Sequence, residues 1–127
     1  VRDPHQLRYA MTIRLTEKAN EESTAILRVS FSDSDGNAVI PKSATWTLSD
    51  RDNEVVNGRD EVQISPLAST VNIVLKGDDL KLPFPRERVR RVLVKAIYDS
   101  STYGDDLPFN EEFEFTITDL RSLNAPA

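Results

Sequence analysis

The stretch Ala44-Thr45-Trp46-Thr47-Leu48 combines a two-residue rhythm with the only tryptophan of the chain. In a β-strand successive side chains point to opposite faces, so Ala44, Trp46 and Leu48 are expected on one face and the two threonines on the other. Burial of the large indole places this strand at the centre of a hydrophobic core. The stretch therefore predicts a strand whose sheet covers a core with one face.

The same alternation recurs on both sides of this strand, at intervals of roughly ten residues. Apolar side chains occupy every second position in the runs Met11, Ile13, Leu15; Leu27, Val29, Phe31; Val71, Ile73, Leu75; Val92, Val94, Ala96, Tyr98; and Phe113, Phe115, Ile117. Two shorter strands are expected at 54–56 and 61–64, joined by the turn pair Asn57-Gly58. No window keeps a helical spacing of apolar residues without Gly or Pro. The pattern predicts an all-β fold, an antiparallel β-sandwich of about seven to eight strands in two sheets.

Composition indicates one globular domain, expected over residues 11–120, with an N-terminal arm at 1–10 and a C-terminal tail at 121–127. Of the 127 residues, 39% are hydrophobic and 29% are charged. The chain has no cysteine, which excludes disulfides, thiolate catalysis and cysteine-based metal sites. The net charge of -5 argues against nucleic acid as a partner, and no apolar run is long enough for membrane insertion.

A Trp facing the core on the third strand and a Tyr at the end of the strand before last resemble the immunoglobulin-like (Ig-like) and fibronectin-III-like β-sandwich. Here these residues are Trp46 and Tyr98. The resemblance implies two sheets, whose strands are 11–17, 24–32, 70–76 and 61–64 in one, and 44–49, 90–98, 112–118 and 54–56 in the other. Because the antibody cysteines are absent, the chain is similar to the disulfide-free bacterial members of this group.

Four short segments carry a second resemblance. Residues 44–52, 74–80, 96–100 and 106–108 are similar to small uncharacterised Ig-like proteins of bacteria and of phage or prophage structural genes. This likeness implies a structural or adhesive role, in a virion or outside the cytoplasm, and it implies no catalytic residues. The expected partner is another protein or a second copy of the chain.

Aspartates are concentrated in loops that the Ig-like resemblance brings to one end of the sandwich. They are Asp33, Asp35, Asp99, Asp105 and Asp106, with Asn37 nearby. Calcium takes six to eight oxygen ligands, so these carboxylates are candidate metal ligands. The alternative is a polar hairpin loop in which Asp and Asn side chains bind their own backbone. The run 33–37 departs from an EF-hand loop because Gly36 is its fourth residue and not its sixth. No other cofactor is expected.

A basic run is expected at the opposite end of the sandwich. Arg86, Arg88, Arg90 and Arg91 offer guanidinium groups that bind phosphate or carboxylate, and a solvated loop is the alternative. An acidic end and a basic end on one body favour head-to-tail packing of copies.

Two further sets of residues are candidates for interaction. Leu93 and Ile97 are apolar positions on the outer face of strand 90–98, suited to a dimer surface or to contact with the arm. Tyr103 and Phe109 are loop aromatics that suit a protein hot spot or a sugar-binding platform. Their alternative role is to close the end of the core.

Catalysis is not expected from this sequence. The single histidine, His5, lies in the arm with no nucleophile near it in sequence. The carboxylates are concentrated in turns and on wet faces, which argues against a paired general acid and base. We therefore expect a non-catalytic structural or interaction module that binds another protein. A carbohydrate-binding accessory domain, with a glycan as ligand, is the alternative.

Overall fold

The described residues form eight β-strands, and seven of them follow strands that the sequence predicts; the exception is the two-residue strand Ala19–Asn20. The computed structural model describes residues 12–15, 18–82 and 88–120. Its strands are β1 (Thr12–Arg14), β2 (Ala19–Asn20), β3 (Thr24–Ser30), β4 (Ser43–Asp50), β5 (Val62–Gln63), β6 (Thr70–Lys76), β7 (Val89–Ser100) and β8 (Gly104–Thr118). A 3-10 helix, η2 (Gly77–Leu80), follows β6. Within the described ranges there is no α-helix, as the sequence predicts.

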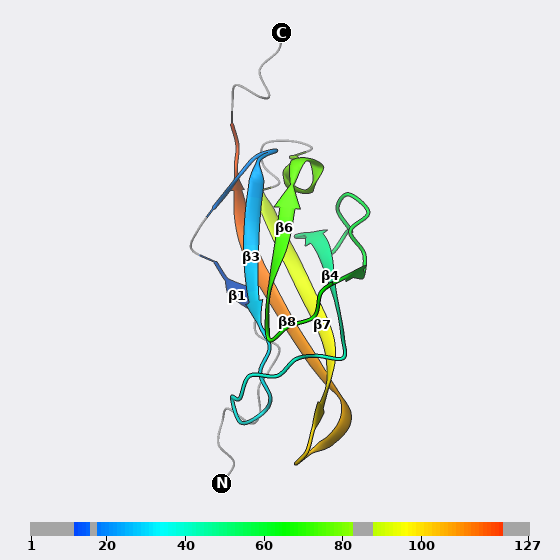
Figure 1. The fold of residues 1–127 in the computed structure, drawn as a ribbon. Helices are drawn as coiled ribbons and strands as arrows, with labels where there is room; N and C mark the ends of the chain where they lie inside the picture. Colours follow the sequence, from blue (N-terminus) through cyan, green and yellow to red (C-terminus); the bar gives the residue numbers. More distant parts are fainter. Residues whose placement is uncertain (1–11, 16–17, 83–87, 121–127) are drawn as a thin grey trace.

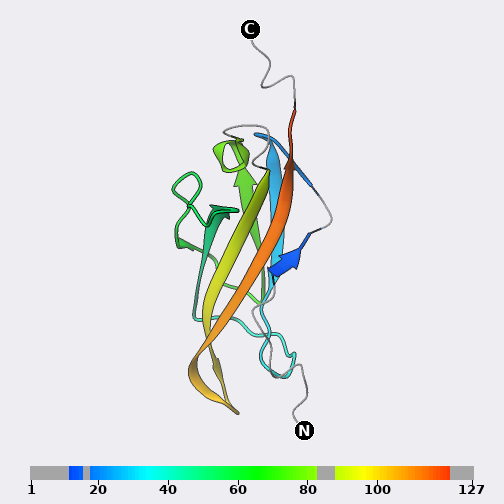
Figure 2. The same ribbon diagram turned by 180° about the vertical axis from the view of Figure 1, so that it is seen from behind.

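The strands form two sheets that lie face to face (Figures 1 and 2). The larger sheet has the order β1-β8-β7-β4-β5, with β2 also paired to β8, and the smaller sheet consists of β3 and β6. β1 and β2 run parallel to β8, so the expectation of a purely antiparallel fold is wrong. The parallel strands cover one edge of β8, which has 15 residues and would otherwise present a long unpaired edge.

The predicted membership of the two sheets is wrong for two strands. The strand expected at 11–17 pairs with β8 and not with β3, and the strand expected at 61–64 pairs with β4 and not with β6. The smaller sheet therefore has two strands, where the resemblance implied four.

A tight turn explains why the chain returns along β4. Asn57 and Gly58 both have positive φ (53° and 64°), as the predicted turn requires, and the N–H of Arg59 donates to the Val56 carbonyl at 3.1 Å. The Leu48 N–H then donates to the Arg59 carbonyl at 2.9 Å. Because the turn reverses the chain immediately beside β4, the next extended residues pair with that strand. The strand expected at 54–56 is reduced to one isolated bridge to β4.

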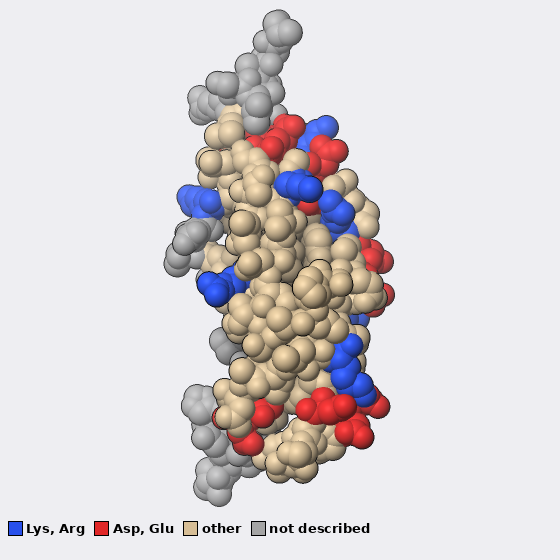
Figure 3. All heavy atoms as spheres, viewed as in Figure 1, with Lys and Arg blue, Asp and Glu red and all other residues tan. Residues whose placement is uncertain are grey.

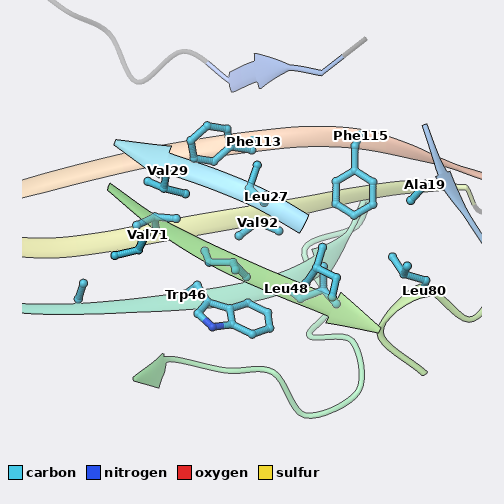
Figure 4. Packing of buried hydrophobic residues seen from close by; sticks show 14 of the residues in the cluster. Ala19, Leu27, Val29, Trp46, Leu48, Val71, Leu80, Val92, Phe113 and Phe115 are labelled. Atoms are coloured by element: carbon cyan, nitrogen blue, oxygen red, sulfur yellow. The ribbon is translucent and has the colours of Figure 1, made fainter. Parts of the chain in front are cut away.

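The core lies between the two sheets and receives apolar side chains from both (Figure 4). Its members include Leu27, Val29, Phe31, Ala44, Trp46, Leu48, Val71, Ile73, Leu75, Val92, Val94, Ala96, Phe113, Phe115 and Ile117. The inward positions of these runs are confirmed, and Tyr98 is also buried. The first run differs: Ile13 and Leu15 are 38% and 37% exposed, because the short β1 lies at the margin of the larger sheet. Met11 lies outside the described residues.

The last strand begins eight residues earlier than the sequence indicates, at Gly104 and not at 112. Asp105, Asp106 and Pro108 are poor strand formers and predict a loop. In the structure this segment pairs with the end of β7, including Ile97 opposite Pro108. Pairing with a strand already held in the core therefore outweighs local propensity here.

Candidate binding surfaces

At the predicted acidic end, one lysine side chain binds two of the candidate aspartates. The Nζ of Lys42 donates to Asp99 Oδ1 at 3.2 Å and also to Asp106 Oδ1, and the backbone N–H of Asp106 donates to Asp99 at 2.9 Å. The hydrogen bond from the Asp106 backbone and the nearby Lys42 ammonium hold the pKa of Asp99 below its ordinary value, although some desolvation opposes them. Two of the five candidate calcium ligands therefore share a protein cation.

Of the other three candidate ligands, Asp33 and Asp35 lie in the loop after β3, whereas Asp105 lies in β8 and not in the predicted loop. Asp33 Oδ1 accepts the backbone N–H groups of Asp35 and Asn37, both at 2.9 Å, which is the polar hairpin arrangement considered as the alternative. Asp35 in turn accepts the Tyr103 hydroxyl at 3.4 Å, and Asp105 is exposed. In the part of the chain that the structure describes, no three His, Asp or Glu side chains gather as a metal site. Calcium binding at this end stays a prediction.

The described arginines of the basic run, Arg88, Arg90 and Arg91, do not form one patch. Arg86 lies outside the described residues, and Arg88 pairs with Asp119 at 3.6 Å. Arg90 is buried and donates to the carbonyls of Val89 and Lys81, a role that its inward phase on β7 could have indicated. Arg91 pairs with Glu114 at 2.9 Å. The side chains of Arg90 and Arg91 thus make hydrogen bonds and an ion pair within the fold.

The outer face of the larger sheet holds Leu93 and Ile97. Leu93 lies between Thr47 and Glu112 of the neighbouring strands, and both apolar side chains are half-buried by such neighbours. Phe109 packs its ring edge-on against Phe31, with centroids 5.3 Å apart, so it helps to close the core. Leu93 and Ile97 are separated along the same face of β7 by the exposed Lys95.

The alternation of the sequence does not predict the open edge of β6, meaning the side of this strand that faces away from β3. Among the described residues β6 pairs only with β3, whereas β4 and β7 each have two neighbouring strands and β8 has three. The ladder to β3 includes Phe31 N–H to Ser69 O at 2.8 Å and Gly77 N–H to Ser23 O at 3.0 Å. Backbone groups alternate in direction along an antiparallel strand, so the N–H and C=O groups of Thr70, Asn72 and Val74 point away from β3.

A groove of about 350 Å³ lies beside the open edge of β6. One wall is β6 itself, over residues 70–74, and the other wall is made by residues 63–66 and Ala68, with Trp46 also lining the groove. Among the strand residues at this edge, Val74 is 45% exposed, and Ile26 opposite it on β3 is 64% exposed. Figure 3 shows largely uncharged surface over the middle of this side of the molecule, with charged groups concentrated toward its ends and margin.

A buried carboxylate ties the end of β6 to the turn after β4. Asp79 is fully buried and accepts hydrogen bonds from Arg59 Nε (2.7 Å), Asn57 Nδ2 (2.8 Å) and the Lys76 backbone N–H (3.0 Å). Burial alone would raise the pKa of Asp79, but these hydrogen bonds and the Arg59 charge outweigh it and hold the pKa below its ordinary value. The Lys76 N–H is thereby occupied, so the open edge ends at Val74.

Comparisons of the chain with models of protein families, with curated proteins and with solved structures gave no match in any of the three. As to membranes, none of the helical structure within residues 12–15, 18–82 and 88–120 has the length and apolarity that a transmembrane helix requires.

Proposed function

We propose that this chain is a non-catalytic interaction module of the Ig-like β-sandwich type, and that it binds an extended segment of a protein partner along the open edge of β6. The position of two aromatic side chains supports the Ig-like assignment. Trp46 on β4 belongs to the core between the facing sheets, and Tyr98 is buried near the end of β7. The observation that carries the binding role is the unpaired edge of β6 itself.

Within its described residues 70–75, the open edge of β6 has none of the sequence features that normally protect a sheet edge. Natural proteins blunt such edges with short strands, charged side chains, proline or bulges. β6 has seven residues, and its residues 70–75 include no charged residue and no proline. The strands at the margins of the larger sheet, β1, β2 and β5, have only two or three residues. An unprotected edge of this length suits a strand that pairs with another chain.

Strand addition explains how such a site would achieve affinity and selectivity. An incoming extended peptide would satisfy the outward N–H and C=O groups of Thr70, Asn72 and Val74 through main-chain hydrogen bonds. Every second side chain of that peptide would point into the groove toward Trp46, so apolar side chains at alternate positions are favoured. The recognised partner is thus an uncharged, extended segment with alternating apolar residues.

Carbohydrate binding has less support from the surface. Sugar platforms use exposed aromatic rings, and among the described residues Tyr103 is the exposed aromatic side chain, at 54%. Phe109 is engaged by the core.

Selection of peptides from a random display library on the immobilised protein tests the proposal. We expect enriched sequences with apolar residues at alternate positions, and NMR shift changes on binding that centre on Asn72 and Val74. Asn72→Pro removes one outward N–H without removing a β3–β6 hydrogen bond, so it should abolish binding, whereas Arg28→Ala on the neighbouring strand should not. Peptides that map to another surface, or strong glycan-array binding without peptide binding, would reject the proposal.

A further inference from the structure

We infer that the segment bound at the open edge of β6 is β6 of a second copy, paired antiparallel about a twofold axis at Asn72. This inference rests on the proposed function, because it names the partner of the same site. The resulting dimer would contain one continuous four-stranded sheet, ordered β3, β6, then β6 and β3 of the partner copy.

The backbone directions along β6 determine the register of this pairing. The outward groups belong to Thr70, Asn72 and Val74, and the next outward N–H, that of Lys76, is held by Asp79 at 3.0 Å. Asn72 is therefore the midpoint of the available edge. Antiparallel pairing about this midpoint sets Thr70 opposite Val74 of the partner copy, and every outward N–H and C=O of the three residues gains a partner.

Charge favours self-pairing at this edge and disfavours it over much of the remaining surface. The chain has a net charge of -5, so two copies repel each other in general. Residues 70–75 carry no charge, and Lys76 would face Ala68 of the partner copy and not another lysine. At the axis two Asn72 side chains meet, and an amide has both a donor and an acceptor, so the pair is self-complementary.

Packing favours the same arrangement. Val71 and Ile73 point to the inner face of β6, so Val71 of one copy would meet Ile73 of the other and extend the apolar layer across the groove beside Trp46. On the outer face, the exposed Val74 of each copy would lie opposite Thr70 of the other. A two-stranded sheet is marginal by itself, and pairing would make it a sheet of four strands.

Variants that introduce a charge at the axis provide the test. Because the Asn72 side chains face each other, Asn72→Lys and Asn72→Asp each place like charges together, and either variant alone should weaken dimerisation by about tenfold or more. A mixture of the two should recover the dimer as a heterodimer. Sedimentation velocity and native mass spectrometry measure these states, with Ile26→Lys, on the same face but away from the axis, as the control that stays dimeric. Trp46 fluorescence verifies folding of each variant.

The inference is overturned if the unmodified chain stays monomeric at high micromolar concentration, or if the mixed variants do not associate. Should a variant fail to fold, amide exchange of the unmodified chain decides, because only pairing at this edge protects Asn72 and Val74 as concentration rises. A monomer that still binds selected peptides at Asn72 rejects the second copy but retains the proposed function. A monomer that binds no such peptide rejects both.

Discussion

Trp46 is the side chain that joins the core to the groove. It is 7% exposed, lines the groove beside β6, and has the Arg59 guanidinium 5.9 Å from its ring centroid. We predict that Trp46→Ala lowers the free energy of unfolding by about 3–5 kcal/mol, because a large cavity replaces the indole. Guanidinium denaturation of dilute protein measures the loss. Thr45→Ala, on the outer face of the same strand, should cost under about 1 kcal/mol. A loss under about 1 kcal/mol for Trp46→Ala would place the indole outside the core.

Asp79 should make stability depend on pH in the acid range. Its pKa in the folded protein lies below its ordinary value of 3.8, so its stabilising effect is complete above that value and disappears as pH falls through the lower, folded-state pKa. Asp79→Asn should therefore lower the free energy of unfolding by about 1–3 kcal/mol at neutral pH, since buried hydrogen bonds to Arg59 and Lys76 are weakened. The difference from the unmodified chain should narrow as pH falls below about 4.

Denaturant titrations at several pH values measure this dependence. Asp78→Asn is the matched control, because Asp78 is the exposed neighbour of Asp79. A difference for Asp79→Asn that is the same at all pH values would show that the carboxylate charge is not what stabilises the turn and the end of β6.

At the scale of the strand, β6 should show alternating protection of its amides from hydrogen exchange. The N–H groups of Val71, Ile73 and Leu75 point to β3, whereas those of Asn72 and Val74 point to the open edge. In dilute solution NMR should therefore find slow exchange for the first three and fast exchange for the other two. β7 has partners on both sides and should show no such alternation in its middle. Equal protection of all five β6 amides would mean that the edge is covered in the monomer.

The strands were largely predictable because alternation is a local property. The inward residues of β3, β4, β6, β7 and β8 follow directly from the two-residue rhythm, and even the turn at Asn57 and Gly58 could be predicted from residue types. Strand neighbours could not be predicted in this way, because pairing depends on contacts between distant parts of the chain. The rhythm identifies β6 as a strand but contains no information about its missing neighbour, so the open edge was not foreseen.

The candidate metal ligands show what residue type alone cannot predict. Residue type selects Asp99 and Asp106 as candidate ligands, but their use depends on a partner distant in sequence, Lys42. Arg90 belongs to the predicted basic run, although it alternates in step with Val92 and Val94 and so points inward on β7. A residue's position in the two-residue alternation therefore indicates its burial more reliably than its residue type does. A binding role can be assigned only when the partners of each side chain are known.

For the molecule as a whole, the two layers depend on each other. In the described part of the chain the β3–β6 sheet has two strands, which are not stable in isolation. Its stability therefore comes from the apolar face that it buries on the larger sheet. Leu75 is 2% exposed at that contact, and Leu75→Ala should lower the free energy of unfolding by about 2–5 kcal/mol. Val74→Ala, one residue away and 45% exposed, should cost under about 1 kcal/mol in dilute protein.

The same dependence predicts how the molecule unfolds. Trp46 belongs to the larger sheet, so its fluorescence reports on that layer, whereas far-UV circular dichroism reports on all strands. If neither layer survives without the other, the two signals should give one coincident transition in denaturant, and Leu75→Ala should shift both midpoints equally although its mutation lies in β6. Two separate transitions, with only the circular-dichroism midpoint shifted by Leu75→Ala, would show that the larger sheet is stable alone. In that case β6 would be weakly attached to the larger sheet and would not present a rigid edge to a partner strand.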